Sequence, residues 1–469
     1  MEKVSILVVS YGSREVAIVD ALARSRNYDV KFYIADKQKN PFNFKIAEEH
    51  IVIPDLDVEK IFDFAKKFKE KIDFCIVSSE APIISGIRDR IETLRIPVIC
   101  PKKEFALEES KVKQRILLQE ICPEVNPEFK VFDPEKDGKT DEVKKKVFSW
   151  LDELNNEVAV KPDKPGYGKG VGVWGDHFNS REEIFRHFLS IYENKGKVII
   201  ERKIDGEESS FQAFCDGKRI LPLPETRDYK RAFENDLGPN TGGMGCYKDS
   251  EEFLPFMTER DREKEIEIAE RIFKKFLIKG KNDALRGLPF YIAFMHSSDG
   301  LKILEINSRP GDPEIISILP IIKDDFVDIC FKMIYGNLRK IEIEKKATVV
   351  TYKVPPSYGG FSEKFPEKVF RDDICKPINL EDAYELTKKE NLRIYPGSLE
   401  LRDDGKFYAL SSRTVASVGI SDTIEEAREI SLKGINAIKG GALWFRSDIA
   451  SKEHIERSIK HMRKLRKCH

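Results

Sequence analysis

Residues 238–245 read Gly-Pro-Asn-Thr-Gly-Gly-Met-Gly, which is the composition of a loop that contacts a ligand. Glycine lets a backbone approach a bound molecule closely, and exposed N–H groups can surround an anion. Four glycines and a proline in eight residues also predict a loop, because neither type suits the interior of a helix or strand. We therefore expect an anionic ligand beside this segment.

A second glycine-rich segment, residues 158–173, contains Lys161 and then Gly168-Lys169-Gly170. A P-loop would need Ser or Thr after its lysine and then a helix, whereas here glycine and a β-like run follow Lys169. The segment instead predicts a hairpin that folds over a triphosphate, with Lys161 reaching the phosphates from the preceding strand. The alternative is an ordinary solvent-exposed hairpin with lysine on its rim.

Two further segments place acidic side chains at the ends of apolar strands. The strand ending at Glu201 leads into Asp205-Gly206-Glu207, where backbone groups can hold an adenine and a carboxylate can accept ribose hydroxyls. Its alternative is a polar turn after a strand. Glu305 and Asn307 lie two positions apart, hence on one face of a strand, and two oxygen ligands suit Mg²⁺ that is also bound by phosphates. The alternative there is capping of a strand end.

The residues that follow, Ser308-Arg309-Pro310-Gly311-Asp312-Pro313-Glu314, bring a cation, two carboxylates and rigid turn residues together, which favours a binding site over a simple cap.

The first hundred residues alternate strand and helix patterns. We expect strands at 5–9, 30–35 and 73–78 and a helix at 15–23, and Val58, Ile61, Phe64, Ala65 and Phe68 give a second helix one apolar face. This βαβ order predicts a doubly wound parallel sheet. Ligands of such sheets bind at the carboxyl ends of the strands, here at loops 10–14 and 79–82.

The remaining patterns predict a mixed α/β chain. We expect a helix at 104–120, an exposed loop at 133–142, a helix at 268–276, and a helix that Thr423 and Glu426 open with a capping box. Strands are expected at 158–160, 171–173, 198–201 and 209–215, and a hairpin at 291–295 and 302–306. The chain is expected to be β-rich again from Lys345, and the basic tail 463–467 to be a solvated, frayed end.

Composition bounds the class of protein. A chain of 469 residues is expected to form about three domains. Its 81 basic and 81 acidic residues cancel, so the overall charge gives no reason to expect nucleic acid or an anionic membrane as partner. The eight cysteines form no Cys-x-x-Cys pair, and the apolar run 4–9 is far shorter than a membrane helix of about 20 residues. We expect a cytoplasmic protein with reduced thiols.

Taken in order, these motifs resemble the ATP-grasp ligases, and within them the phosphoribosylamine–glycine ligase family. The resemblance extends over essentially the whole chain. It is carried by Ser79-Glu80-Ala81-Pro82, Ser110-Lys111, Lys161 with Gly168-Lys169-Gly170-Val171, Asp205-Gly206-Glu207-Glu208, Asp228-Tyr229-Lys230-Arg231, Gly238–Gly245, Asn307–Glu314, Ser412-Arg413 and Arg446-Ser447-Asp448-Ile449. Gly-Pro-Asn-Thr-Gly-Gly-Met-Gly and Arg-x-Gly-Asp-Pro-Glu are its most specific parts.

The resemblance implies a reaction of de novo purine biosynthesis. ATP phosphorylates the carboxylate of glycine, and the amine of 5-phosphoribosylamine attacks the glycyl phosphate to give glycinamide ribonucleotide, ADP and phosphate. No protein nucleophile is needed, so catalysis consists of positioning and charge stabilisation.

The resemblance also implies site residues. Catalytic groups would be Arg309 on the transferring phosphoryl group or the acyl phosphate, and Asp228 and Asp312 on the ammonium of glycine. The implied ATP-binding residues are Lys111, Lys161, Gly168, Lys169, Gly170, Glu201, Lys203 and Glu207. Glu305 and Asn307 would hold Mg²⁺ or Mn²⁺. The implied substrate-binding residues are Gly12, Arg14 and Glu80 for phosphoribosylamine, and Asn240, Thr241, Gly242, Gly243, Met244 and Gly245 in a loop that closes over the reacting groups.

The implied architecture has three domains: an N-terminal doubly wound parallel-sheet domain at 1–104, an ATP-grasp domain at 105–340 and a β-rich C-terminal α+β domain at 341–469. The ATP-grasp domain would have two α+β subdomains, with a glycine-rich hairpin lid within about 121–195. We expect a monomer or weak homodimer.

Several positions depart from the family pattern: Ser10, Ser13 and Val16 in the first loop, Ser78-Ser79, Ala293, Pro310 and Ile316. The altered first loop leaves open a related ATP-grasp enzyme that joins another carboxylate to another amine. A second alternative is a nucleotide-binding protein without ligase activity, which would require that Lys161 or Glu305 does not reach ATP. A dehydrogenase is disfavoured, because the first loop lacks Gly-x-Gly-x-x-Gly.

Overall fold

The computed structural model describes residues 1–164, 170–194, 196–279, 282–369 and 371–467. By their contacts the residues group into two compact units. The first unit comprises Met1–Ala106, Ser209–Tyr291 and Asn307–Ile459, and the second comprises Leu107–Glu208, Ile292–Ile306 and Lys460–His469. Our sequence-based boundaries near residues 104 and 340 remain a prediction.

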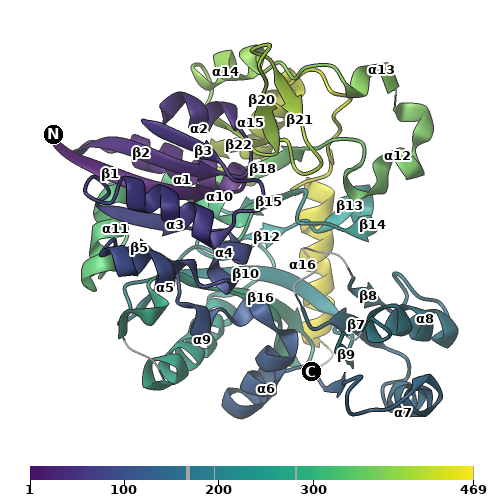
Figure 1. The fold of residues 1–469 in the computed structure, drawn as a ribbon. Helices are drawn as coiled ribbons and strands as arrows, with labels where there is room; N and C mark the ends of the chain where they lie inside the picture. Colours follow the sequence, from purple (N-terminus) through teal and green to yellow (C-terminus); the bar gives the residue numbers. More distant parts are fainter. Residues whose placement is uncertain (165–169, 195, 280–281, 370, 468–469) are drawn as a thin grey trace. The chain divides into compact units, whose positions relative to one another are not determined.

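A five-stranded parallel sheet begins the first unit, with strand order β3-β2-β1-β4-β5 (Figure 1). Its strands are β1 (Glu2–Ser10), β2 (Tyr28–Asp36), β3 (Glu49–Val52), β4 (Phe74–Val77) and β5 (Val98–Ile99). The helices between them are α1 (Ser13–Ala23), α2 (Pro41–Ile46), α3 (Val58–Lys67), α4 (Glu80–Ile84) and α5 (Ile87–Ile91). The predicted doubly wound parallel sheet is confirmed.

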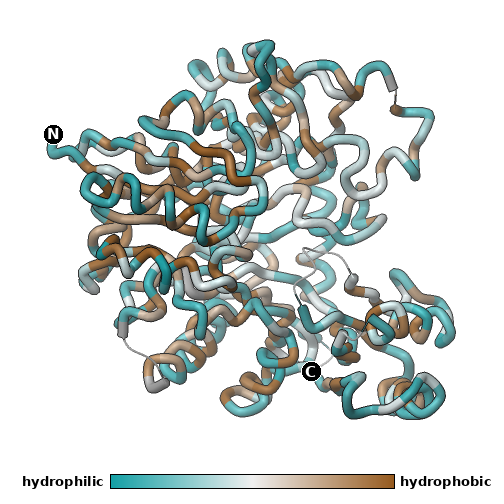
Figure 2. The backbone as a smooth tube through the Cα atoms, viewed as in Figure 1, coloured by the Kyte–Doolittle hydropathy of each residue, from teal (hydrophilic) through white to brown (hydrophobic). Residues whose placement is uncertain are grey.

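The central strands β1 and β4 are buried apolar runs, as the brown tube of β1 shows in Figure 2, whereas the edge strand β3 is only partly buried. Leu7 and Val9 of β1 face Ile61 and Ala65 of α3 in one core cluster. The opposite face packs against α1 and against α11 (Phe326–Tyr335), where Phe331 contacts Phe74. Such a layered sheet presents its loops at the carboxyl edge of the strands.

A second sheet of the first unit is antiparallel, with order β12-β15-β18-β22-β19. Its strands are β12 (Arg227–Asp228), β15 (Gly245–Lys248), β18 (Ala347–Lys353), β19 (Leu392–Pro396) and β22 (Val415–Ser421). Helix α15 (Ile424–Ala437) packs on β18 and β22, and its cap Thr423 accepts the Glu426 N–H. The predicted return to β-structure after Lys345 is confirmed, and this sheet also joins that region to the end of the 238–245 segment.

The second unit contains an antiparallel sheet of order β6-β9-β7-β8. Its strands are β6 (Phe129–Phe132), β7 (Val158–Pro162), β8 (Gly172–Val173) and β9 (Val198–Arg202). Helices α7 (Thr140–Glu153) and α8 (Arg181–Tyr192) supply the apolar side chains that fill one core with it. The predicted strands at 158–160, 171–173 and 198–201 are confirmed.

A further sheet has the order β11-β10-β16-β17, and residues of three of its strands are divided between the two units. The strands are β10 (Gly206–Cys215), β11 (Ile220–Pro222), β16 (Gly287–Ser297) and β17 (Gly300–Asn307). Other elements of the chain are α6 (Lys111–Ile121), α9 (Glu259–Lys279), α10 (Glu314–Ile318), α12 (Phe361–Lys364), α13 (Arg371–Ile374), α14 (Glu381–Thr387) and α16 (Lys452–Lys467), with the hairpins β13 (Arg231–Phe233)–β14 (Leu237–Asn240) and β20 (Leu399–Leu401)–β21 (Phe407–Ala409).

Three local predictions were wrong. The expected helix 104–120 begins only at Lys111, because Ser110 is extended and its hydroxyl caps the Lys113 N–H. Gly238 and Pro239 lie in β14, since an irregular two-stranded hairpin tolerates residues that a central strand does not. The basic tail is not a frayed end but the last turns of α16, where Met462 is buried.

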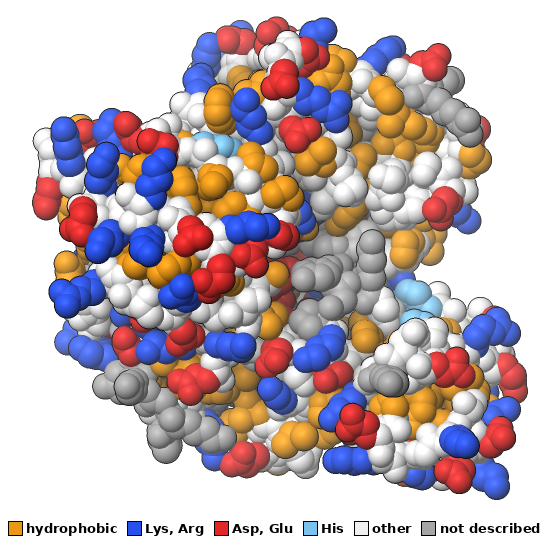
Figure 3. All heavy atoms as spheres, viewed as in Figure 1, with side chains coloured by type: hydrophobic (Ala, Val, Ile, Leu, Met, Phe, Trp, Pro, Cys, Tyr) orange, Lys and Arg blue, Asp and Glu red, His pale blue; other side chains and the backbone are white. Residues whose placement is uncertain are grey.

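The surface agrees with the charge balance. On the face shown in Figure 3, basic and acidic side chains are interspersed. Within the described part of the chain, every helix is too short or too polar to cross a lipid bilayer.

Candidate functional site

In the second unit, Lys161 and Glu201 lie on neighbouring antiparallel strands, β7 and β9. Lys161 Nζ contacts Glu201 Oε1 and lies 3.4 Å from the Leu304 carbonyl oxygen. Both side chains are almost fully buried. Burial lowers the pKa of the Lys161 ammonium from its usual value. Burial would raise the pKa of Glu201, but the positive charges of Arg115 and Lys161 hold it below the usual value.

Arg115 of α6 completes this group. Its Nε donates to Glu201 Oε2 at 2.8 Å and its Nη2 to Glu201 Oε1 at 3.1 Å, a two-pronged pairing that fixes the carboxylate. The same Nη2 donates to the Leu304 carbonyl at 2.7 Å. We call Arg115, Lys161 and Glu201 the buried triad. Sequence reasoning missed Arg115, although it lies one helical turn after the predicted Lys111.

The start of α6 is fixed by Asp163, two residues beyond Lys161. The Asp163 carboxylate accepts the Ser110 hydroxyl at 2.5 Å and the Val112 N–H at 3.0 Å, and its carbonyl accepts the Lys111 N–H at 3.0 Å. Lys111 is therefore held at the first turn of a helix that is attached directly to the strand of Lys161.

The residues that were predicted to bind the adenosine part of ATP have hydrogen-bond partners in the same unit. His461 Nδ1 lies 2.7 Å from Glu207 Oε1, and its Nε2 lies 3.3 Å from Asp205 Oδ1. Lys203 Nζ donates to the Trp174 carbonyl at 2.7 Å. Because Glu207 is largely buried, its carboxylate is held in a defined position.

The glycine-rich hairpin is only partly described. Gly168 and Lys169 lie outside the described residues. Gly170 has a φ of +85°, which favours glycine, and its carbonyl oxygen lies 2.9 Å from His187 Nε2.

The predicted metal ligands occupy strand β17, with Glu305 half-buried and Asn307 buried. The charge of Glu305 acts on the Lys161 ammonium. Among the described residues no group of three or more His, Cys, Asp or Glu side chains is arranged to hold a metal ion. A carboxylate and an amide oxygen two positions apart fit an ion such as Mg²⁺, which takes few protein ligands and completes its shell with phosphate and water.

In the first unit, the loop after β1 is organised by Glu15. This buried carboxylate accepts the backbone N–H groups of Tyr11 at 3.2 Å and Gly12 at 2.9 Å. It also accepts the hydroxyls of Ser78 at 2.6 Å and Ser79 at 3.2 Å. The N–H groups of Tyr11 and Gly12 are thus directed to a side chain of the protein itself rather than to a ligand.

Arg14 and Arg309 meet at Glu80. Arg14 Nη2 and Arg309 Nε lie 3.8 and 3.7 Å from Glu80 Oε2, and Arg14 Nη1 donates to the Pro310 carbonyl at 3.0 Å. Burial would raise the pKa of Glu80, but Arg309 and then Arg14 hold it below its usual value. The carboxylate is therefore ionised at neutral pH between two guanidinium groups.

Asp312 is held by two residues from the C-terminal part of the sequence. Arg413 Nη2 donates to Asp312 Oδ2 at 3.0 Å and its Nη1 to the Asp312 carbonyl at 2.7 Å. The Tyr352 hydroxyl donates to Asp312 Oδ1 at 2.6 Å, and the Arg413 guanidinium lies 4.8 Å from the Tyr352 ring centre. We call Asp312, Tyr352 and Arg413 the Asp312 clamp.

The clamp also holds the glycine loop. Arg413 Nη1 donates to the Gly242 carbonyl at 2.6 Å, and the Gly242 N–H donates to the Tyr358 hydroxyl at 3.0 Å. Gly243 has a φ of +107°, and a Cβ there would lie 2.8 Å from Asp228 Oδ1. The loop therefore needs glycine where it passes Asp228.

The other residues of the segment are part of regular structure or the interior. Asn240 pairs with Arg231 in the β13–β14 hairpin, and Gly245 pairs with Thr351 in the second sheet. Thr241 donates to the Lys230 carbonyl at 2.9 Å, and Met244 is fully buried. The segment thus has two anchored ends and an irregular middle.

The first unit accordingly brings Arg14, Glu80, Arg309, Asp312 and Arg413 together, and we call this group the strand-edge cluster. Sequence reasoning gave no role to Arg413, although it belongs to a segment that carries the resemblance, and it missed Glu15 and Tyr352. Nothing local in the sequence marks Tyr352, which looks like an ordinary residue of a buried strand.

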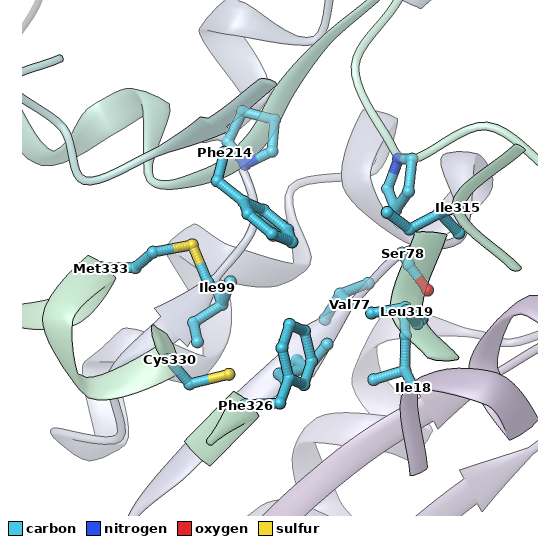
Figure 4. A pocket seen from close by; sticks show the side chains of 14 residues that line it. Ile18, Val77, Ser78, Ile99, Phe214, Ile315, Leu319, Phe326, Cys330 and Met333 are labelled. Carbon is cyan, nitrogen blue, oxygen red and sulfur yellow. The ribbon is translucent and has the colours of Figure 1, made fainter. Parts of the chain in front are cut away.

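A cavity in the first unit has a different character from this cluster (Figure 4). Its volume is about 30 Å³, and apolar side chains such as Ile18, Phe214, Phe326 and Met333 line it. A space of this size holds about one water molecule. We interpret it as a packing space of the core.

Comparisons with known proteins identify the family of this chain. The family described as "Phosphoribosylglycinamide synthetase, N domain" matches residues 4–109, and "Phosphoribosylglycinamide synthetase, ATP-grasp (A) domain" matches residues 134–315. The phosphoribosylamine–glycine ligase of Pyrococcus furiosus is 36% identical over 99% of this chain and 98% of its own. That of Methanocella arvoryzae is 36% identical over 98% of this chain and 99% of its own.

Solved structures show the same fold. The phosphoribosylamine–glycine ligase of Thermotoga maritima matches with a TM-score of 0.72 and 23% identity, over 95% of this chain and 100% of its own. The N5-carboxyaminoimidazole ribonucleotide synthetase of the same organism matches with a TM-score of 0.58 and 16% identity, over 94% of this chain and 99% of its own.

Proposed function

Because this chain belongs to the phosphoribosylamine–glycine ligase family, and is an ATP-dependent ligase of purine biosynthesis, we propose how its residues divide the reaction. A carboxylate oxygen of glycine attacks the γ-phosphorus of ATP, and the bond to ADP breaks. The nitrogen of phosphoribosylamine then attacks the acyl carbon of glycyl phosphate. The C–N bond forms, the nitrogen loses a proton, and phosphate leaves.

Lys161 and Lys111 neutralise the phosphates of ATP. Lys161 is the stronger candidate, since burial makes an interaction with phosphate oxygens less screened by water. Glu201 contacts Lys161 and is itself fixed by Arg115. We therefore assign Glu201 two roles: it positions Lys161, and it binds the adenosine part of ATP. Glu207 accepts ribose hydroxyls, and Lys203, Gly170 and the hairpin residues Gly168 and Lys169 complete the nucleotide contacts.

Glu305 and Asn307 hold Mg²⁺ or Mn²⁺. When bound, the ion offsets the repulsion between phosphate oxygens. Both residues are on the strand that leads into Arg309, so phosphate contacts and substrate contacts follow one another along the chain.

Glycine binds at the glycine loop and the Asp312 clamp. Asp228 and Asp312 receive its ammonium group, and the segment 240–245 closes over the reacting groups. Arg309 stabilises the transferring phosphoryl group, because a planar guanidinium matches two of its oxygens. The fixed geometry of Asp312 is what orients glycine for attack.

Phosphoribosylamine binds at the carboxyl edge of the parallel sheet, where Gly12, Arg14 and Glu80 lie. Glu80, ionised between Arg14 and Arg309, attracts and orients the amine. The observation that carries the proposal is this convergence: Glu80 lies more than two hundred residues before Arg309 and Asp312 in the sequence, yet all three share one cluster.

The test is ADP release by the purified protein with ATP and Mg²⁺. We expect release that requires glycine and phosphoribosylamine together, and an Asp312→Asn variant with a much lower kcat/KM for glycine. Equal turnover of glycine with unrelated amines, or of phosphoribosylamine with other carboxylates, would overturn the substrate assignment. It would instead support a relative that joins a different pair.

We also propose that the protein acts in the cytoplasm as a monomer or weak homodimer. Light scattering at increasing protein concentration measures the oligomeric state. A stable tetramer would contradict it.

A further inference from the structure

Lys37 lies at the carboxyl edge of the parallel sheet, one residue beyond β2. Its N–H donates to the carbonyl of Ser10, the last residue of β1, at 3.0 Å. Its Nζ lies 4.3 Å from the ring centre of Tyr11, a distance at which an ammonium group is attracted to the ring face. The lysine head is therefore held beside the loop that follows β1.

Tyr11 connects this lysine to the strand-edge cluster. Burial and then the negative charge of Glu80 raise the pKa of the Tyr11 phenol. Arg413 and Asp312 also act on it, so the phenol lies within electrostatic reach of the cluster. Glu80 likewise acts on Lys37, whose pKa is lowered by burial. Lys37 is thus a half-buried cation at the edge of the proposed phosphoribosylamine site.

The arginines of this edge already have anionic partners. Arg14 Nε donates to Glu15 at 2.9 Å, Arg413 is paired with Asp312, and Arg309 faces Glu80. The backbone N–H groups of Tyr11 and Gly12 also point to Glu15. Lys37 differs, because in the described part of the chain no carboxylate oxygen lies within ion-pair distance of its Nζ.

We propose that Lys37, stacked on Tyr11, binds the 5-phosphate of phosphoribosylamine and of the product. A phosphate carries two negative charges, and a partly desolvated lysine without a carboxylate partner supplies a positive charge beside arginines that are already paired. The inference rests on the proposed function, since it names the group that recognises one end of that substrate. It also assigns Gly12 and Arg14 to shaping the loop rather than to holding the phosphate.

The experiment measures binding of the stable product, glycinamide ribonucleotide, and of its dephosphorylated form, by calorimetry on the full chain. Lys37→Met removes the charge. Lys39→Met is the matched control, because Lys39 is in the same loop and lies 4.4 Å from an aromatic ring centre, that of Phe44. We expect Lys37→Met to weaken binding of the phosphorylated product by about 10- to 100-fold, as for loss of a charge-assisted hydrogen bond.

The dephosphorylated product provides the discriminating comparison. We expect wild type, Lys37→Met and Lys39→Met to bind it equally, and Lys37→Arg to retain most of the affinity for the phosphorylated form. If Lys37→Met binds the phosphorylated product as tightly as wild type, the inference is wrong. If the wild type binds neither form, the proposed function itself fails, and this outcome is distinct from the first.

Discussion

Replacing Arg413 by methionine removes the central donor of the Asp312 clamp while keeping a side chain of similar length. Three hydrogen bonds are lost, two to Asp312 and one to the Gly242 carbonyl, with donor–acceptor distances of 2.6 to 3.0 Å. The stacking on Tyr352 is lost as well. Asp312 keeps one strong donor, the Tyr352 hydroxyl.

The burial of the pair sets the size of the effect. The side chains of Arg413 and Asp312 are 13% and 7% exposed, so solvent cannot replace the lost partner well. Breaking a buried ion pair costs about 3–5 kcal/mol, and the remaining Tyr352 bond places the expectation near 3 kcal/mol. Since about 1.4 kcal/mol is a tenfold change, a cost of about 3 kcal/mol in positioning glycine corresponds to roughly a 150-fold loss in kcat/KM for glycine.

The assay is steady-state ADP release with varied glycine at saturating ATP and phosphoribosylamine. We expect the loss in kcat/KM for glycine, because Asp312 and the Gly242 loop are the proposed glycine contacts. The KM for ATP should change by less than about threefold. Arg413→Lys keeps the charge without the two-pronged geometry, so its kcat/KM for glycine should fall between those of wild type and Arg413→Met.

Arg402→Met is the control for removing an arginine that stacks on tyrosine. Arg402 lies 4.2 Å from the Tyr408 ring centre and 3.2 Å from Glu400, but these groups are on the β20–β21 hairpin. Arg402→Met should therefore leave kcat/KM for glycine unchanged. A folded Arg413→Met protein whose kcat/KM for glycine stays within twofold of wild type would refute the assignment of the clamp to glycine positioning.

Three further outcomes are expected. Arg115→Met should lower the unfolding free energy by about 3–5 kcal/mol in urea titration, and replacing Glu201 by leucine as well should restore part of it; a milder single variant would contradict the buried pairing. Burial and then the charge of Glu265 raise the pKa of Glu225 well above its usual value, so the stability from protonated Glu225 is lost as pH rises from the ordinary glutamate range toward the raised value. Glu225→Gln should flatten this fall in thermal unfolding at stepped pH, and parallel curves would exclude it. Gly243→Ala should abolish ligase activity while ATP binding persists, and an active variant would show that the loop can adapt.

The sequence predicted the elements whose patterns are local. The apolar runs of β1 and β2 and the one-sided apolar face of α3 predicted the doubly wound sheet, because burial on both faces or on one face leaves a periodicity that can be read directly. Boundaries were predicted less well where a single polar side chain decided them, as Ser110 did for the start of α6.

The candidate site was likewise predicted only in part from the sequence. Short motifs of unusual composition, such as residues 238–245 and the pair Glu305 and Asn307, could be proposed as binding segments from their own residues. Their partners could not, because Arg115 and Tyr352 are single residues in ordinary helical and strand patterns. The roles of the binding residues themselves remain predictions.

What the sequence determined by itself was therefore the fold class and the family, and it also supplied the candidate binding segments, since each depends on local periodicity or on a contiguous motif. Only the tertiary structure decided which charges neutralise one another. Arg413 reaches Asp312 across 101 residues of sequence and Arg115 reaches Glu201 across 86. The same structure directs the loop after β1 to Glu15 and leaves Lys37 without a carboxylate among the described residues. The energy of a buried charge depends on every group within a few ångströms, and chain order carries no record of those distances.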